Sequence, residues 1–150
     1  MIKIICVGSI KEKELTALIQ EYLKRISKYT KIEIVEIPDY NYDIKDTLKT
    51  EGELILKHIS TKDFVITMEI DGKELDSVAL SEKIRTTYIT NSNITFVIGG
   101  SYGLDGSAKE RSNFKLSFSK LTFPHQLFRL ILLEQIYRSF KIINNETYHK

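Results

Sequence analysis

The chain is poor in the features that would place it in several common classes of protein. It has 150 residues and a single cysteine, Cys6, so no disulfide can form within it, which fits a reducing cytoplasm. No apolar stretch approaches the ~20 residues that span a bilayer, and the N-terminus shows no signal peptide. The formal net charge is only +2, lower than is usual for a protein that binds nucleic acid by charge alone. We therefore expect a cytoplasmic chain, and any RNA would have to be held by a local patch, a dimer or shape.

Motifs for metals and for the commonest nucleotides are missing too. The three histidines are scattered along the chain and Cys6 is far from each, so no metal site is expected. Neither the Gly-x-Gly-x-x-Gly spacing nor the phosphate-cradling Gly-x-x-x-x-Gly-Lys-Ser/Thr spacing occurs, which gives a dinucleotide or a nucleoside triphosphate little support. Cys6 lies inside the first apolar run, where a small core residue is more usual than a nucleophile.

The sequence does contain a regular alternation of strand-like and helix-like segments. β-Branched apolar runs that end in turn residues predict strands, and apolar residues at three-and-four spacing predict helices. The expected strands are residues 1–7, 31–37, 63–70, 93–98 and 114–118, and the expected helices are about 13–27, 44–59, 78–88, 107–113 and 125–142. Asp71-Gly72 is expected to form a turn. The pattern predicts one α/β domain over residues 1–150, with a mostly parallel sheet and helices on both faces.

The fourth expected strand runs directly into a glycine-rich loop, Gly99-Gly100-Ser101-Tyr102-Gly103. Open α/β sheets bind ligands at the carboxyl ends of their strands. Glycine there allows a positive φ and lets a ligand approach the backbone amides. A tight turn from strand to helix would explain the same glycines, so both interpretations stay open.

The segment from Phe118 to His125 is a second candidate for ligand binding. Pro124 restricts Phe123 to an extended conformation and separates the segment from the last helix. Free backbone amides and carbonyls beside apolar side chains would suit a purine ring, which needs an apolar slot and a few hydrogen bonds at its edge. A plain loop is the alternative.

The last expected helix, residues 125–142, is apolar around most of its circumference. A helix of this kind must be covered on nearly all sides, and a partner subunit is a natural cover in a small protein. Glu134 and Arg138 stand four residues apart, which is ordinary helix pairing. Arg129 and Arg138 nevertheless lie in apolar surroundings, where charge is costly without a partner, so a functional role for at least one of them is expected.

Several segments together resemble one known family, the RlmH family of SPOUT-class methyltransferases, which modify a pseudouridine of large-subunit ribosomal RNA. The resemblance rests on Ile98–Leu104, Leu121–Leu127 with Arg129, Leu133–Arg138 and Tyr148–Lys150, supported by Met1–Ile4, Val7-Gly8 and Asp71–Lys73. Length and motif order match over the entire chain. In this family tyrosine commonly follows a proline, and here that position is Thr147, which leaves the ordering of Tyr148 in the free protein open.

The resemblance implies a fold, a cofactor and a reaction. The fold would be an α/β knot with the C-terminal part threaded through a loop, and the active unit would be a homodimer. The reaction would be methyl transfer from S-adenosylmethionine to N3 of a pseudouridine in helix 69, on the ribosome. The cofactor residues implied are Met68, Gly99, Gly100, Gly103, Phe118, Ser119, Lys120, Leu121, Thr122 and Phe123.

The resemblance also assigns residues to chemistry and to RNA. Arg138, Tyr148 and His149 would be catalytic, and His125, Arg129 and Lys150 would contact RNA. Since pseudouridine N3 must lose its proton, a base is needed, and His149, the Tyr148 hydroxyl and a water molecule are the candidates. Arg138 could stabilise charge on the neighbouring carbonyl oxygens. A nucleotide-binding module without catalysis, and a related methyltransferase acting on another RNA such as transfer RNA, remain alternatives.

Overall fold

The computed structural model describes residues 1–150 and contains the expected alternation of strands and helices. The strands are β1 (Ile2–Val7), β2 (Ile32–Ile37), β3 (Phe64–Glu74), β4 (Ile94–Ile98) and β5 (Phe114–Ser117). The helices are α1 (Lys13–Ile26), α2 (Ile44–Lys57), α3 (Ser77–Thr90), α4 (Gly106–Arg111) and α5 (His125–Ile143). None of these helices is long and apolar enough to cross a membrane.

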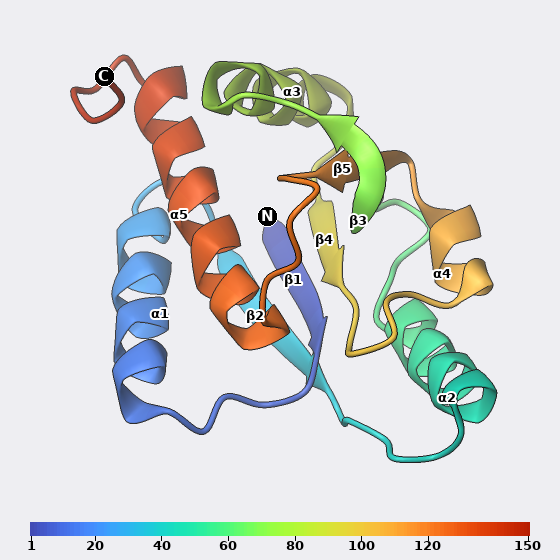
Figure 1. The fold of residues 1–150 in the computed structure, drawn as a ribbon. Helices are drawn as coiled ribbons and strands as arrows, with labels where there is room; N and C mark the ends of the chain where they lie inside the picture. Colours follow the sequence, from blue (N-terminus) through green and yellow to red (C-terminus); the bar gives the residue numbers. More distant parts are fainter.

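The strands form a single parallel sheet in the order β2-β1-β4-β3-β5. Helices α1, α3 and α5 cover one face, and α2 and α4 cover the other (Figure 1). The central strand β4 is buried along its full length, as expected for a parallel strand that is covered on both sides. The predicted α/β class, with helices on both faces of the sheet, is confirmed. The knot implied by the resemblance stays a prediction.

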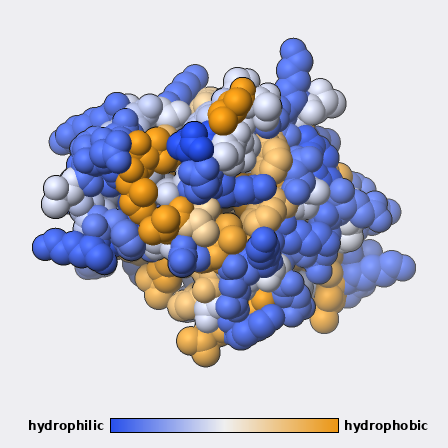
Figure 2. Space-filling model, turned by 90° about the horizontal axis from the view of Figure 1, so that it is seen from above, coloured by the Kyte–Doolittle hydropathy of each residue, from blue (hydrophilic) through white to orange (hydrophobic).

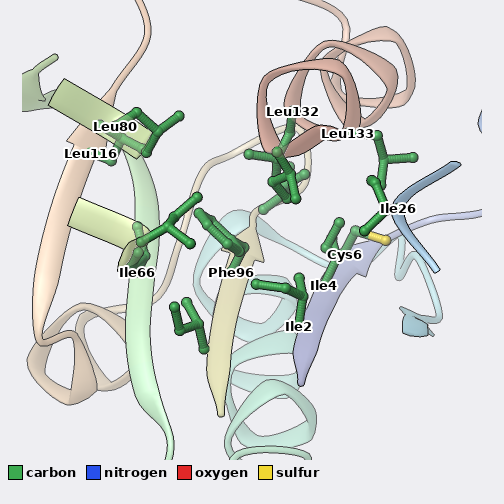
Figure 3. Close-up of a cluster of buried hydrophobic side chains, with 14 of the residues drawn as sticks. Ile2, Ile4, Cys6, Ile26, Ile66, Leu80, Phe96, Leu116, Leu132 and Leu133 are labelled. Carbon is green, nitrogen blue, oxygen red and sulfur yellow. The ribbon is translucent and has the colours of Figure 1, made fainter. Parts of the chain in front are cut away.

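The larger hydrophobic cluster lies between the sheet and the layer of α1, α3 and α5. Figure 3 shows side chains from β1, β3, β4 and β5 meeting others from α1, α3 and α5, with Phe96 of β4 among them. Cys6 belongs to this cluster, and burial raises the pKa of its thiol to about 12. The thiol therefore stays protonated near neutral pH, which confirms its prediction as a core residue.

The predicted turn at Asp71-Gly72 is wrong. Strand β3 continues through these residues, but its register against β5 shifts, because both Met68 and Lys73 lie opposite Leu116. A Cβ atom at Gly72 would lie 2.8 Å from backbone atoms of β5. The glycine therefore permits a close approach of two strands at a bulge. The sequence around Gly72 does not show whether the glycine serves a bulge or a turn.

Much of the apolar surface of α5 is buried by the rest of the same chain. The expectation that this helix needs a partner subunit to cover nearly all of its sides is therefore corrected in part. It packs on the sheet between α1 and α3 (Figure 1), and Leu132, Leu133, Ile136 and Phe140 are buried there. Leu127 stays 41% exposed. Seen from above, apolar side chains gather in a connected area of the surface (Figure 2), so some apolar surface remains after the chain has folded.

Candidate active site

A pocket with a cavity volume of about 170 Å³ lies at the carboxyl ends of β4 and β5, beside Met68–Ile70 of β3. It is smaller than the ~300–1,000 Å³ that is usual for small-molecule sites. Most of its wall comes from the ends of these strands, the glycine loop and the segment before α5. The lining residues are Met68, Glu69, Ile70, Ile98, Gly99, Gly100, Gly103, Leu116, Ser117, Phe118, Ser119, Leu121, Thr122, Phe123, His125 and Phe128. The fold thus brings the two candidate segments of the sequence to one place.

All the predicted cofactor residues line this pocket except Lys120. The Lys120 ammonium lies 3.9 Å from the Asp71 carboxylate, and the two side chains are 71% and 94% exposed. Lys120 therefore faces solvent. Sequence patterns missed Glu69 and Ile70, which follow Met68 within β3, and Phe128, which lies one helical turn after His125.

Each of the three glycines of the loop is required, or favoured, for a different structural reason. A Cβ atom at Gly99 would clash with the carbonyl group of Gly103, and the φ of Gly103 is +81°. A Cβ atom at Gly100 would point away from solvent, 3.0 Å from Val7 and 3.3 Å from Glu51. The Gly103 amide donates to the Gly100 carbonyl at 3.1 Å and closes the turn. The loop is thus a tight turn and also a wall of the pocket, so the two interpretations of its glycines are compatible.

An aromatic group forms the apolar side of the pocket. The Phe128 ring centre lies 5.1 Å from that of Phe118 and 6.0 Å from that of Phe123. Ser119 and Leu121 line the same pocket, where the Ser119 hydroxyl accepts from the Leu121 amide at 3.0 Å. The three rings are tilted to one another, by 55° and 37°, and together form an apolar wall that suits a heteroaromatic ring.

His125 opens α5 and lines the pocket, and its Nε2 atom is buried with no hydrogen-bond partner. A buried polar atom of this kind is costly unless a ligand or water supplies a partner. His125 therefore lies at the pocket. Its contact with RNA stays a prediction.

Arg129 does not have the position that an RNA contact needs. Its side chain is 3% exposed, its Nη1 donates to Glu36 at 3.1 Å and its Nη2 donates to the Gly8 carbonyl at 3.0 Å. The guanidinium holds the start of α5 to the ends of β1 and β2. The structure corrects the RNA-binding prediction for Arg129, since its charge is already paired inside the protein.

The predicted catalytic residues form a second group, which we call the C-terminal cluster: Glu134, Arg138, Tyr148 and His149. Arg138 Nη2 donates to Glu134 Oε1 at 2.6 Å, and the Tyr148 hydroxyl donates to the same oxygen at 3.0 Å. Arg138 Nη1 lies 3.2 Å from His149 Nδ1. The Tyr148 ring lies under the Arg138 guanidinium at 4.7 Å and meets Tyr137 edge-on at 5.0 Å. The tail is therefore held against α5 although Thr147 replaces the usual proline.

Proton positions in the C-terminal cluster follow from these contacts. Burial, and then the hydrogen bond to Glu134, raise the pKa of Tyr148 well above its ordinary value, so its hydroxyl stays protonated. The Glu134 carboxylate raises the pKa of Arg138. Because a guanidinium can only donate, Nδ1 of His149 accepts and its Nε2 carries the hydrogen. In this arrangement neither Tyr148 nor His149 has an unoccupied atom that could accept a proton. Nδ1 of His149 becomes available only when its hydrogen bond to Arg138 breaks.

The pocket and the C-terminal cluster lie at opposite ends of α5 (Figure 1). Arg138 follows His125 by thirteen positions in one helix, a separation of about 20 Å at the helical rise per residue. The exposed Lys150 ends the tail on the side of the cluster. One chain thus keeps its candidate cofactor pocket and its candidate catalytic residues apart.

Comparison with known proteins gives concordant matches over almost the whole chain. Residues 1–149 match a family model described as predicted SPOUT methyltransferase. The chain is 55% identical over 157 residues to a putative ribosomal RNA large subunit methyltransferase H of Methanococcus maripaludis, with 99% of each chain covered. It is 52% identical over 157 residues to the ribosomal RNA large subunit methyltransferase H of Clostridium botulinum, again with 99% of each covered. A solved structure of a probable methylase family protein from Haemophilus influenzae has a TM-score of 0.58 at 14% identity, covering 99% of this chain and 70% of that one, and supports the fold alone.

Proposed function

The chain belongs to the RlmH family of SPOUT methyltransferases, and from this premise we propose that it methylates ribosomal RNA with S-adenosylmethionine as the methyl donor. The target we propose is N3 of a pseudouridine in helix 69 of the large-subunit RNA. The names of the relatives support ribosomal RNA as the substrate, and the family resemblance in the sequence motifs supports the pseudouridine.

The single observation that carries the proposal furthest is the separation along α5. The pocket and Arg138 are about 20 Å apart, whereas a methyl group moves between atoms that are about 3–3.5 Å apart. We therefore infer that the active unit is a homodimer in which the tail of one copy reaches the pocket of the other. The exposed apolar side chains of Leu127 on α5 and Leu121 just before it support such an interface.

The pocket suits S-adenosylmethionine on three counts. The Phe118, Phe123 and Phe128 rings offer an apolar slot for adenine, and the backbone of the same segment can meet its edge. The Gly99–Gly103 turn presents backbone without side chains to the remainder of the molecule. His125 also lines the pocket and adds an imidazole ring to its wall. When bound, the cofactor supplies a methyl group on a positively charged sulfur.

The C-terminal cluster suits the other half of the reaction. As N3 loses its proton, negative charge spreads to the neighbouring carbonyl oxygens, where a protonated Arg138 would stabilise it. Tyr148 keeps its proton and acts as a donor and a stacking surface, not as the base. The proton would go to water, or to His149 once it has turned away from Arg138. This narrows the three candidates for the base to two.

The reaction and its substrate can be tested together with tritiated S-adenosylmethionine. Ribosomes that lack the modification, their isolated large subunits, bare large-subunit RNA and bulk transfer RNA would each receive the purified protein. We expect label in large-subunit RNA in at least one of these preparations and none in fully modified ribosomes, which serve as the control. Label only in transfer RNA would favour another RNA substrate, and no label in any RNA would favour a module without catalysis.

A further inference from the structure

Glu69 is the only carboxylate among the residues that line the pocket, and no lysine or arginine lines it. The other lining residues are apolar, small or hydroxyl-bearing, apart from His125. The Glu69 side chain is only 13% exposed. A single negative group in such surroundings acts strongly on a nearby charge, because little water is present to screen it.

The environment of Glu69 holds its carboxylate in place without cancelling its charge. The hydroxyl of Thr67, two residues earlier on β3 and fully buried, donates to Glu69 Oε2 at 2.7 Å. Lys109 approaches Oε1 only to 3.9 Å, and its side chain is 47% exposed to solvent. The other charges nearby, Lys120 and Asp71, pair with each other outside the pocket. The pocket therefore keeps a negative group of its own.

We propose that Glu69 distinguishes the charged methyl donor from its neutral product. The inference rests on the proposed function, because it requires S-adenosylmethionine in this pocket. During transfer the S–CH₃ bond breaks, its electron pair stays on sulfur, and the methyl group forms a bond to N3, whose proton passes to water or His149. The sulfonium thus becomes an uncharged thioether, and the attraction to Glu69 is lost. Glu69 favours binding of the donor and release of the product.

Three ligands that differ at one position test the proposal by titration calorimetry. S-adenosylmethionine carries a positive sulfur, S-adenosylhomocysteine carries a neutral one, and sinefungin carries a positively charged amine group at the same place. Glu69→Gln retains the size of the side chain and an acceptor for Thr67. We expect it to weaken both cationic ligands about tenfold, equivalent to ~1.4 kcal/mol, and the neutral ligand less than about threefold.

Two further variants guard against trivial explanations. Glu110→Gln removes one charge from an exposed position on α4 and is expected to leave all three affinities unchanged. Glu69→Asp retains the charge and is expected to retain the preference for cationic ligands, even if all three affinities fall. Circular dichroism confirms that each variant is folded.

The outcomes separate this inference from the function on which it rests. Equal weakening of the three ligands by Glu69→Gln would place the carboxylate against a part that all three share, and would overturn the proposal. Unchanged affinities would overturn it as well, while leaving the pocket assignment intact. If the unaltered protein bound none of the three ligands, the proposed cofactor itself would be wrong.

Discussion

Gly99→Ala is expected to lower the affinity for S-adenosylmethionine about 100-fold, or ~2.7 kcal/mol. The added Cβ atom would clash with the Gly103 carbonyl group, which is backbone and cannot rotate away. The turn would have to open, and Gly100 and Gly103, which both line the pocket, would move with it. The affinity is measured by calorimetry with the purified protein.

The matched control for this substitution is Gly106→Ala. A Cβ atom at Gly106 has no neighbour within 4 Å, and the residue starts α4 just beyond the same loop. The affinity of the Gly106→Ala protein for S-adenosylmethionine should remain within about twofold of that of the unaltered protein, since alanine favours the helix that starts here. A Gly99→Ala protein that is folded and binds the cofactor normally would show that this loop is a turn and no part of the cofactor site.

Arg138→Ala is expected to slow methyl transfer about 10²–10³-fold, the usual loss when one group that stabilises developing charge is removed. The same change should leave the dissociation constant of S-adenosylmethionine unaltered, because Arg138 is no part of the pocket wall and its proposed role is to stabilise charge on the RNA base. Initial rates with tritiated cofactor and calorimetry on the same preparation measure the two effects.

Arg85→Ala is the control for the loss of an arginine. Arg85 pairs with Glu82 on α3 at 2.6 Å, the same distance that joins Arg138 to Glu134, but it belongs to neither the pocket nor the cluster. It should retain full activity. Loss of cofactor binding in Arg138→Ala, or normal transfer, would remove Arg138 from its proposed role.

The fold was largely predictable because parallel strands and amphipathic helices leave strong local patterns. Most boundaries agree within two residues, and β4 ends at Ile98 as the pattern indicates. The bulge at Gly72 was not predictable, because its reason is the approach of β5, more than forty residues later in the chain. Contacts between distant segments determine which of several uses a glycine serves.

The site was predictable as a set of segments and less so as a set of side chains. Lys120 belongs to the correct segment, but only the structure shows that it faces solvent toward Asp71. The partner of Arg129 is Glu36, ninety-three residues away in the chain. The sequence near Arg129 therefore gives no indication that its charge is buried and paired. Glu69 was missed because a charged residue at the end of an apolar strand is ordinarily an exposed one.

A mixture of two inactive variants tests the central claim, that two copies of the chain complete one active site. Gly99→Ala disables the pocket and Arg138→Ala disables the cluster, so a dimer of one copy of each retains one intact combination. Unfolding and refolding the variants together at equal amounts should restore about a quarter of the normal rate of methyl transfer, because about half of the dimers are mixed and each has one working site of two. A rate no greater than the sum of the separate variants would contradict the account.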